Sequence, residues 1–166
     1  MKPVAVLVGA PGSGKSTIGP LLAAALGVGF RDVDADIEAA AGKPISEIFV
    51  DDGEEHFRAL ERAAVAEAVS SHDGVVSLGG GAILAPSTRD LLRSHTVVYL
   101  SVDLPDALAR VGLGSGRPLL SVNPRATLRF LLDQRRPLYE EVATITVKTD
   151  GRTPEQITEE LASALA

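Results

Sequence analysis

The chain has 166 residues, enough for one globular domain with a sizeable core; 45% of them are hydrophobic and 23% are charged. Its net charge of −6, from 16 lysines and arginines against 22 acidic residues, gives no general attraction for nucleic acid or an anionic membrane. The absence of cysteine excludes disulfides, thiolate catalysis and cysteine-ligated metal centres.

Short apolar runs alternate with segments of helical period along the chain. The runs predict buried strands at Val4–Val8, Phe30–Val33, Val75–Leu78, Val97–Leu100 and Ile145–Val147. Helices are expected at about 17–26, 35–41, 53–71, 86–93, 105–111, 125–132 and 154–165. This alternation predicts an α/β fold with a five-stranded parallel sheet flanked by helices. The segment 112–124, with three glycines and two prolines, is predicted to be a mobile surface loop.

No uncharged stretch, Ser16–Phe30 included, reaches the roughly 20 residues that a membrane-spanning helix needs. We therefore expect a soluble, cytoplasmic protein.

The sequence "GAPGSGKS", Gly9–Ser16, matches the phosphate-binding P-loop pattern at every fixed position and lies between a predicted strand and a predicted helix. Its glycines allow a tight turn that directs backbone N–H groups at phosphate oxygens. Lys15 would reach the β- and γ-phosphates, and the Ser16 hydroxyl would ligate Mg²⁺. The loop predicts nucleotide binding, but by itself it fits a metabolite kinase, a GTPase, an ATPase motor or a non-catalytic regulator equally.

Two aspartates follow the second predicted strand in "FRDVDAD". Asp32 and Asp34 are two residues apart, so on a strand both would face the same side and project toward the P-loop. One carboxylate could hold the water ligands of Mg²⁺ and the other could accept a proton from an attacking hydroxyl. The alternative is a helix cap, for which Asp34 is well placed.

Several basic residues remain ambiguous from composition alone. Arg58 and Glu61 are three apart on a predicted helix, where a solvated ion pair is the favoured interpretation. Arg117 lies in the glycine-rich loop, where it is either solvated or a cation that closes over a phosphate. "RRPLY", 135–139, is predicted at a helix end, where basic residues also stabilise the helix dipole. The glycines of "SLGGGA", 77–82, suggest a second phosphate loop or a degenerate metal-binding strand.

Together these stretches resemble the shikimate kinase family, small P-loop kinases related to the nucleoside monophosphate kinases. The resemblance runs nearly end to end and depends on six motifs in family order. They are "GSGKSTIG" (12–19), "DVDADIE" (32–38), "GEEHFRALE" (53–61), "SLGGGA" (77–82), "GRPLL" (116–120) and "RRPLY" (135–139). It implies a P-loop kinase fold with ATP- and Mg²⁺-dependent phosphorylation of the 3-hydroxyl of shikimate.

The resemblance also implies roles for individual residues. The nucleotide would be held by Gly12, Ser13, Gly14, Lys15, Ser16, Thr17, Arg110, Arg117 and Arg152. The metal would be held by Ser16 and, through water, by Asp32. Shikimate would be held by Asp34, Arg58, Gly79, Gly80, Gly81 and Arg135. Lys15, Asp34 and Arg117 are the expected catalytic residues, with Asp34 as the candidate to take the hydroxyl proton.

The third predicted strand ends in Ser77 rather than the aspartate of many P-loop proteins, so metal binding would depend on Ser16 and Asp32. We expect a single domain with a substrate-binding region at about 33–61 and a lid at about 112–124. Its partners would be ATP, ADP and shikimate, without nucleic acid or membrane, and the protein would be a monomer. The alternatives are a kinase of another small hydroxy acid such as gluconate, and a regulator that binds ATP without turnover.

Overall fold

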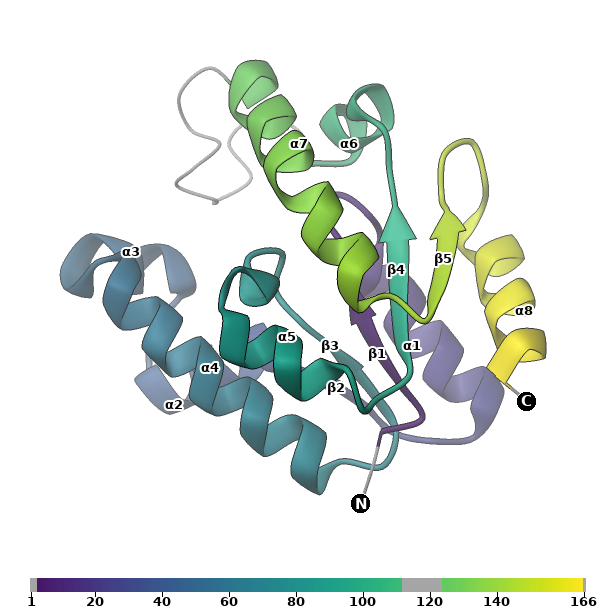
Figure 1. Ribbon diagram of the computed structural model, residues 1–166, viewed down its shortest axis with the longest axis horizontal. Coiled ribbons are helices and arrows are strands. Elements are labelled where there is room, and N and C mark those ends of the chain that lie inside the picture. Colours follow the sequence, from purple (N-terminus) through teal and green to yellow (C-terminus); the bar gives the residue numbers. More distant parts are fainter. Residues whose placement is uncertain (1–2, 112–123, 166) are drawn as a thin grey trace.

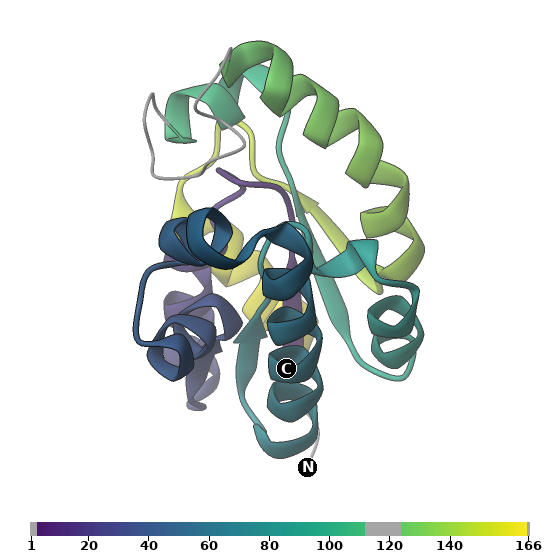
Figure 2. The same ribbon diagram turned by 90° about the vertical axis from the view of Figure 1, so that its left-hand side faces the viewer.

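The computed structural model describes residues 3–111 and 124–165, which form a five-stranded sheet with helices on both sides (Figure 1 and Figure 2). The strands are β1 (Ala5–Val8), β2 (Phe30–Asp32), β3 (Val75–Ser77), β4 (Val97–Ser101) and β5 (Ile145–Lys148). Their order across the sheet is β2-β3-β1-β4-β5, and every neighbouring pair is parallel. The predicted α/β architecture is confirmed.

The central strand β1 is buried on both faces, as its continuous apolar sequence predicts. Ala5 and Leu7 pack on one face beneath α1 (Lys15–Leu26) and α8 (Pro154–Leu165), and Val6 and Val8 pack on the other. The second face is covered by α2 (Val33–Ala41), α3 (Ile45–Asp52), α4 (Glu54–Ser71), α5 (Pro86–Leu92), α6 (Leu104–Val111) and α7 (Pro124–Val142). The sheet therefore separates two apolar cores.

The sequence-based boundaries are wrong at two helices. Helix α3, Ile45–Asp52, was not predicted, because it has only eight residues and lies between Gly42 and Gly53; it is stabilised by Ile48, which is completely buried. Helix α7 continues ten residues beyond the predicted end at Leu132. Pro137 costs a backbone hydrogen bond, but Tyr139 and Val142 extend the buried face of the helix past it. "RRPLY" therefore lies within α7 and not at a helix end.

The loops after β1 and β3 diverge although the two strands are hydrogen-bonded neighbours. The chain after β1 enters α1 on one face of the sheet, whereas the chain after β3 passes through the short 3₁₀ helix η1 (Ala82–Leu84) into α5 on the other. Such a divergence opens a crevice at the carboxyl edge of a parallel sheet. Within the described ranges, no helix is both long and apolar enough to cross a membrane.

Candidate active site

The loop between β1 and α1 forms one wall of a pocket of about 280 Å³ in this crevice. Gly12 and Gly14 have φ angles of 82° and 100°, a left-handed region that favours glycine, and α1 begins directly after Gly14. The Lys15 amino group donates to the carbonyl of Gly9 at 2.5 Å and to that of Ala10 at 3.2 Å. On this side the pocket is lined by Gly12, Gly14, Lys15, Ser16 and Thr17. The N-terminus of α1 therefore faces a space suited to an anion.

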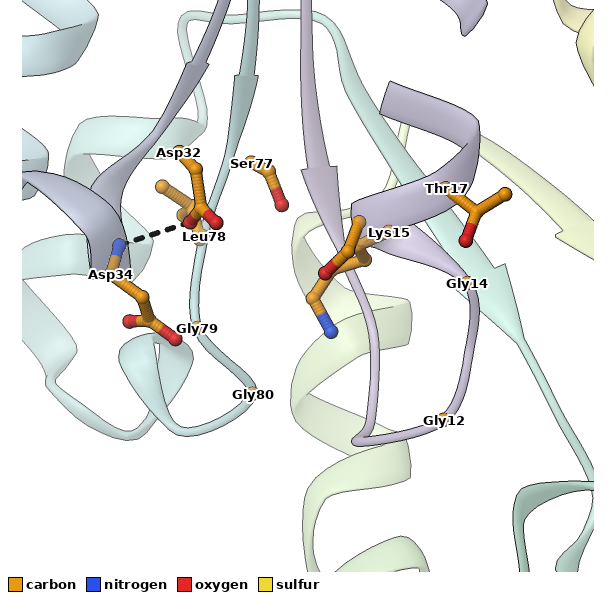
Figure 3. A pocket seen from close by; sticks show the side chains of 11 residues that line it. Gly12, Gly14, Lys15, Thr17, Asp32, Asp34, Ser77, Leu78, Gly79 and Gly80 are labelled. Atoms are coloured by element: carbon orange, nitrogen blue, oxygen red, sulfur yellow. Dashed lines mark hydrogen bonds between the residues drawn. The ribbon is translucent and has the colours of Figure 1, made fainter. Parts of the chain in front are cut away.

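Asp32 and Asp34 lie across the pocket from the P-loop (Figure 3). The prediction that both project from one strand is wrong, because β2 ends at Asp32 and Asp34 lies in the first turn of α2. Asp32 is the residue that caps this helix, accepting a hydrogen bond from the Asp34 N–H at 3.0 Å. The cap positions Asp32 at the end of the strand and directs the next turn so that both carboxylates reach the pocket.

The Asp32 carboxylate fits a magnesium site completed by phosphates. Burial raises its pKa above the ordinary value of 3.8, while its hydrogen bond from the Asp34 N–H and the charge of Lys15 oppose this shift. A cation nearby would stabilise the charged form, and the Ser16 hydroxyl provides a second oxygen ligand in the same pocket. No cluster of three or more metal-binding side chains occurs among residues 3–111 and 124–165. A carboxylate and a hydroxyl, from Asp32 and Ser16, are enough protein oxygens for Mg²⁺, which retains waters and phosphate ligands.

The turn after β3, Gly79–Gly81, is enclosed by charged side chains. A Cβ atom on Gly79 would lie 2.7 Å from Asp34 Oδ1 and 3.1 Å from Glu61 Oε2. A Cβ on Gly81 would overlap the Arg58 guanidinium, with Cζ only 2.7 Å away. These distances are too short for carbon, so the missing side chains are what allow the charged groups of α2 and α4 to approach the turn.

Gly80 lies close to two further elements of the site, α7 and the P-loop. A Cβ atom there would lie 3.4 Å from Arg135 Nη1 on α7 and 3.2 Å from Pro11 Cδ in the P-loop. The turn is therefore approached by two carboxylates, two guanidinium groups and the P-loop; the side chains are those of Asp34, Glu61, Arg58 and Arg135. The expectation that it acts as a second phosphate loop has no support here, because the P-loop occupies the opposite wall of the same pocket.

Arg58 and Glu61 form a 2.9 Å ion pair, but the surface interpretation is wrong because the Glu61 side chain is only 4% exposed. Burial raises the pKa of the Glu61 carboxyl above its ordinary value of 4.5, and the charge of Arg58 opposes this shift. The Arg58 guanidinium also lies 5.3 Å from the centroid of the Phe57 ring. Glu61 therefore holds Arg58 against the glycine turn.

Arg135 is buried on the inner face of α7, whereas the adjacent Arg136 is exposed. Burial lowers the pKa of the Arg135 guanidinium from its ordinary value, although arginine remains charged. Among the described residues, its buried Nε has no hydrogen-bond partner. A buried cation with an unused donor is suited to an anionic ligand. Of the two arginines in "RRPLY", it is therefore Arg135 that faces the site.

Some predicted residues lie elsewhere. Ser13 is a buried residue of the P-loop, and its hydroxyl accepts a hydrogen bond from Lys15 Nζ at 3.4 Å. It does not line the pocket. Arg152 follows β5 and forms a 2.9 Å ion pair with Glu160. Arg117, the side chain of Arg110 and nearly all of the expected lid lie outside the described residues.

Two residues at the site received no individual role from the sequence. Ser77 pairs with Asp32 in the sheet, and its side chain lines the pocket between the aspartates and the P-loop. Tyr139 is buried on α7, and its hydroxyl donates to the Gly80 carbonyl. The four-residue spacing between Arg135 and Tyr139 was the available signal, since it places both on one face of a helix.

A P-loop facing a carboxylate pair across the crevice of a parallel sheet defines the class as P-loop kinase. The family model described as shikimate kinase matches residues 11–166. The chain belongs to the shikimate kinase family. The shikimate kinase of Salinispora arenicola (strain CNS-205) is 69% identical over 100% of this chain and 99% of its own length.

Solved structures give the same family. The shikimate kinase from Acinetobacter baumannii in complex with shikimate has a TM-score of 0.94 and 37% identity, covering 99% of this chain and 93% of its own. A gluconokinase from Sinorhizobium meliloti 1021 has a TM-score of 0.61 and 26% identity, covering 97% of this chain and 90% of its own. The weaker match to the gluconokinase disfavours the gluconate alternative.

Replacing Gly81 with alanine should selectively disturb the side of the glycine turn that faces Arg58. Gly81 has a φ of −99°, which alanine tolerates, so the only new element is a Cβ that overlaps the Arg58 guanidinium. We expect the KM for shikimate to rise about 10-fold or more, as for disruption of a buried charged contact, with the KM for ATP nearly unchanged. Steady-state kinetics with each substrate varied would check this, and an equal rise in both KM values would contradict it.

Replacing Glu61 with glutamine should change how stability depends on pH. A carboxyl whose pKa is raised by folding stabilises the native state below its unfolded pKa, and this contribution is lost as pH rises through the native pKa. Relative to E61Q, the wild type should therefore gain stability as the pH is lowered from neutrality toward the ordinary glutamate pKa of 4.5. Urea unfolding across this range would measure the difference.

The matched control is E55Q, at an exposed position of the same helix. It removes one carboxylate from α4 without touching the buried pair. If the stability difference between the wild type and E61Q stayed constant with pH, or changed in the opposite direction, the assignment of a raised Glu61 pKa would be wrong.

Proposed function

We propose that the pocket binds ATP against the P-loop and the carboxylated acceptor against the glycine turn. As a member of the shikimate kinase family, the chain is an ATP-dependent kinase that acts on shikimate. We assign the 3-hydroxyl as the atom that receives the γ-phosphate. The observation that supports these assignments is the placement of Arg58 and Arg135 against a side-chain-free turn that also meets the P-loop. Arginine pairs bind carboxylates through directional, charge-assisted hydrogen bonds.

At the nucleotide end, backbone N–H groups of residues 12–17 would surround the phosphates. Lys15 would exchange its contacts with the loop carbonyls for oxygens of the β- and γ-phosphates. Ser16, together with Asp32 acting through water, would hold Mg²⁺, which neutralises phosphate charge when it is bound. These residues fix the donor and leave the γ-phosphate facing the aspartates.

At the acceptor end, Asp34 would bind the 3-hydroxyl, and Arg58 and Arg135 would hold the carboxylate. During transfer, a bond forms between the hydroxyl oxygen and the γ-phosphorus while the bond to the β–γ bridging oxygen breaks. The hydroxyl proton passes to Asp34, and ADP leaves with the negative charge. The contact of the Asp34 carboxylate with the Gly79 position supports this role, because it places the acid beside the glycine turn.

The remaining basic residues are assigned to the nucleotide. Arg117 would bring a positive charge to the γ-phosphate from the lid at 112–124, and Arg110 and Arg152 would flank the adenine. For Arg152, this requires release from its ion pair with Glu160, a partly exposed contact that costs little to break. We further propose a monomeric, single-domain cytoplasmic protein with its acceptor region at about 33–61.

The function is tested by ADP release from Mg·ATP with shikimate, quinate, gluconate and nucleoside monophosphates as acceptors. We expect shikimate to give the strongest stimulation. D34N should lower kcat with shikimate about 100-fold or more, as expected for removal of a general base, while leaving ATP binding intact. Stronger stimulation by another acceptor would contradict the assignment of shikimate as the substrate. ATP binding without stimulated turnover would instead favour a regulator.

Arg135 and Arg136 offer a matched pair of variants on one helix. R135A removes a buried cation that contacts the glycine turn, whereas R136A removes an exposed one. We expect R135A to raise the KM for shikimate about 30-fold or more, as for truncation of one member of a buried charge pair, and R136A to change it less than about threefold. Similar effects of both variants would remove Arg135 from the acceptor site.

A further inference from the structure

Tyr139 connects α7 to the glycine turn from behind. Its side chain is 1% exposed, and its hydroxyl donates to the carbonyl oxygen of Gly80. Its ring stacks on Tyr99 of β4, with centroids 5.0 Å apart and ring planes inclined by 26°. The ring is thus held by the sheet, and its single donor is directed at one peptide group of the turn.

Fixing the Gly80 carbonyl also fixes the N–H of Gly81. The two groups belong to one planar trans peptide and point in opposite directions, so the N–H faces away from Tyr139. Within the described part of the chain, no hydrogen bond uses this N–H. It belongs to the residue whose Cβ position meets the Arg58 guanidinium. An anion held by Arg58 therefore has a backbone donor beside it, whose direction depends on the tyrosine hydroxyl.

Tyr139 and Arg135 are both buried on the inner face of α7. Tyr139 follows Arg135 by one helical turn, and the interaction between the two side chains favours the charged guanidinium. Burial raises the pKa of Tyr139 well above its ordinary value of 10.0, so the hydroxyl keeps its proton and remains a donor. Tyr139 therefore donates to the Gly80 carbonyl and lies one helical turn from a buried cation of the site.

We propose that Tyr139 is a positioning residue for the acceptor carboxylate. Its hydroxyl orients the Gly81 N–H and the Arg135 guanidinium so that both donate to the same anionic group. This inference depends on the proposed function, because it assumes that the carboxylate of shikimate lies between these donors. It concerns binding of the acceptor and predicts no direct part in phosphoryl transfer.

The test is Y139F, with Y99F as the matched control that removes the hydroxyl of the stacked partner. Y139F should raise the KM for shikimate about 3- to 10-fold, the usual effect of one lost hydrogen bond, while kcat and the KM for ATP change less than about twofold. Y99F should leave all three parameters within about twofold. An unchanged KM for shikimate in Y139F, or an equal rise in the KM for ATP, would overturn the proposal.

The methyl ester of shikimate separates positioning from general packing. The ester keeps the hydroxyls but has no carboxylate charge, so little of the Y139F effect should remain when kcat/KM is measured with it. If Y139F lowers kcat/KM equally for the acid and the ester, Tyr139 acts through packing and the proposal fails. If the wild type turns over neither compound but accepts another acid, the proposed substrate fails instead.

A spectroscopic measurement avoids any dependence on the folding of Y139F. The chain has only two tyrosines, so Y99F leaves Tyr139 as the only one. Labelling tyrosine with ¹³C at the ring carbon bonded to the hydroxyl would give a single resonance. Saturating shikimate should shift this resonance, and saturating methyl ester should shift it much less. No shift with shikimate, at a concentration that saturates binding, would overturn the proposal.

Discussion

The acceptor end of this site depends on one steric constraint, the lack of side chains at the turn after β3. A Cβ atom at Gly79 would meet the carboxylates of Asp34 and Glu61, and one at Gly81 would meet the Arg58 guanidinium. These groups come from α2 and α4, which are far from the turn in sequence. A single β-carbon at either glycine would push them apart. The turn therefore sets how closely charges from separate helices approach one another.

Convergence of these charges has an electrostatic cost in the absence of a ligand. Burial raises the pKa of Glu61 and lowers that of Arg135, so folding disfavours the charged form of each group. The Arg58–Glu61 ion pair offsets part of this cost, whereas the Arg135 Nε has no acceptor in the described residues. A carboxylate bound there would supply the missing acceptor and offset part of the cost of burying the guanidinium.

The crevice itself follows from strand order. β1 and β3 are adjacent, yet the chain leaves them toward opposite faces of the sheet. The P-loop and the glycine turn therefore become opposite walls of one pocket, and the capping interaction of Asp32 holds both aspartates across the pocket from the P-loop. The donor and acceptor halves meet because parallel strands bring all their carboxyl ends to one edge.

The sequence by itself determined the α/β class, the five strands and the P-loop, because these depend on local periodicity and on a glycine pattern. It also indicated Arg58, Asp34, Arg135 and the glycine turn through six short motifs. Tertiary structure decided that Glu61 is buried, that Asp32 rather than Asp34 caps α2, and that α7 continues past Pro137 to carry Tyr139. The burial of Glu61 and the length of α7 depend on contacts between residues distant in the chain, and the cap forms where the pairing of β2 with β3 ends, at Asp32 and Ser77. Local propensity carries no information about such contacts.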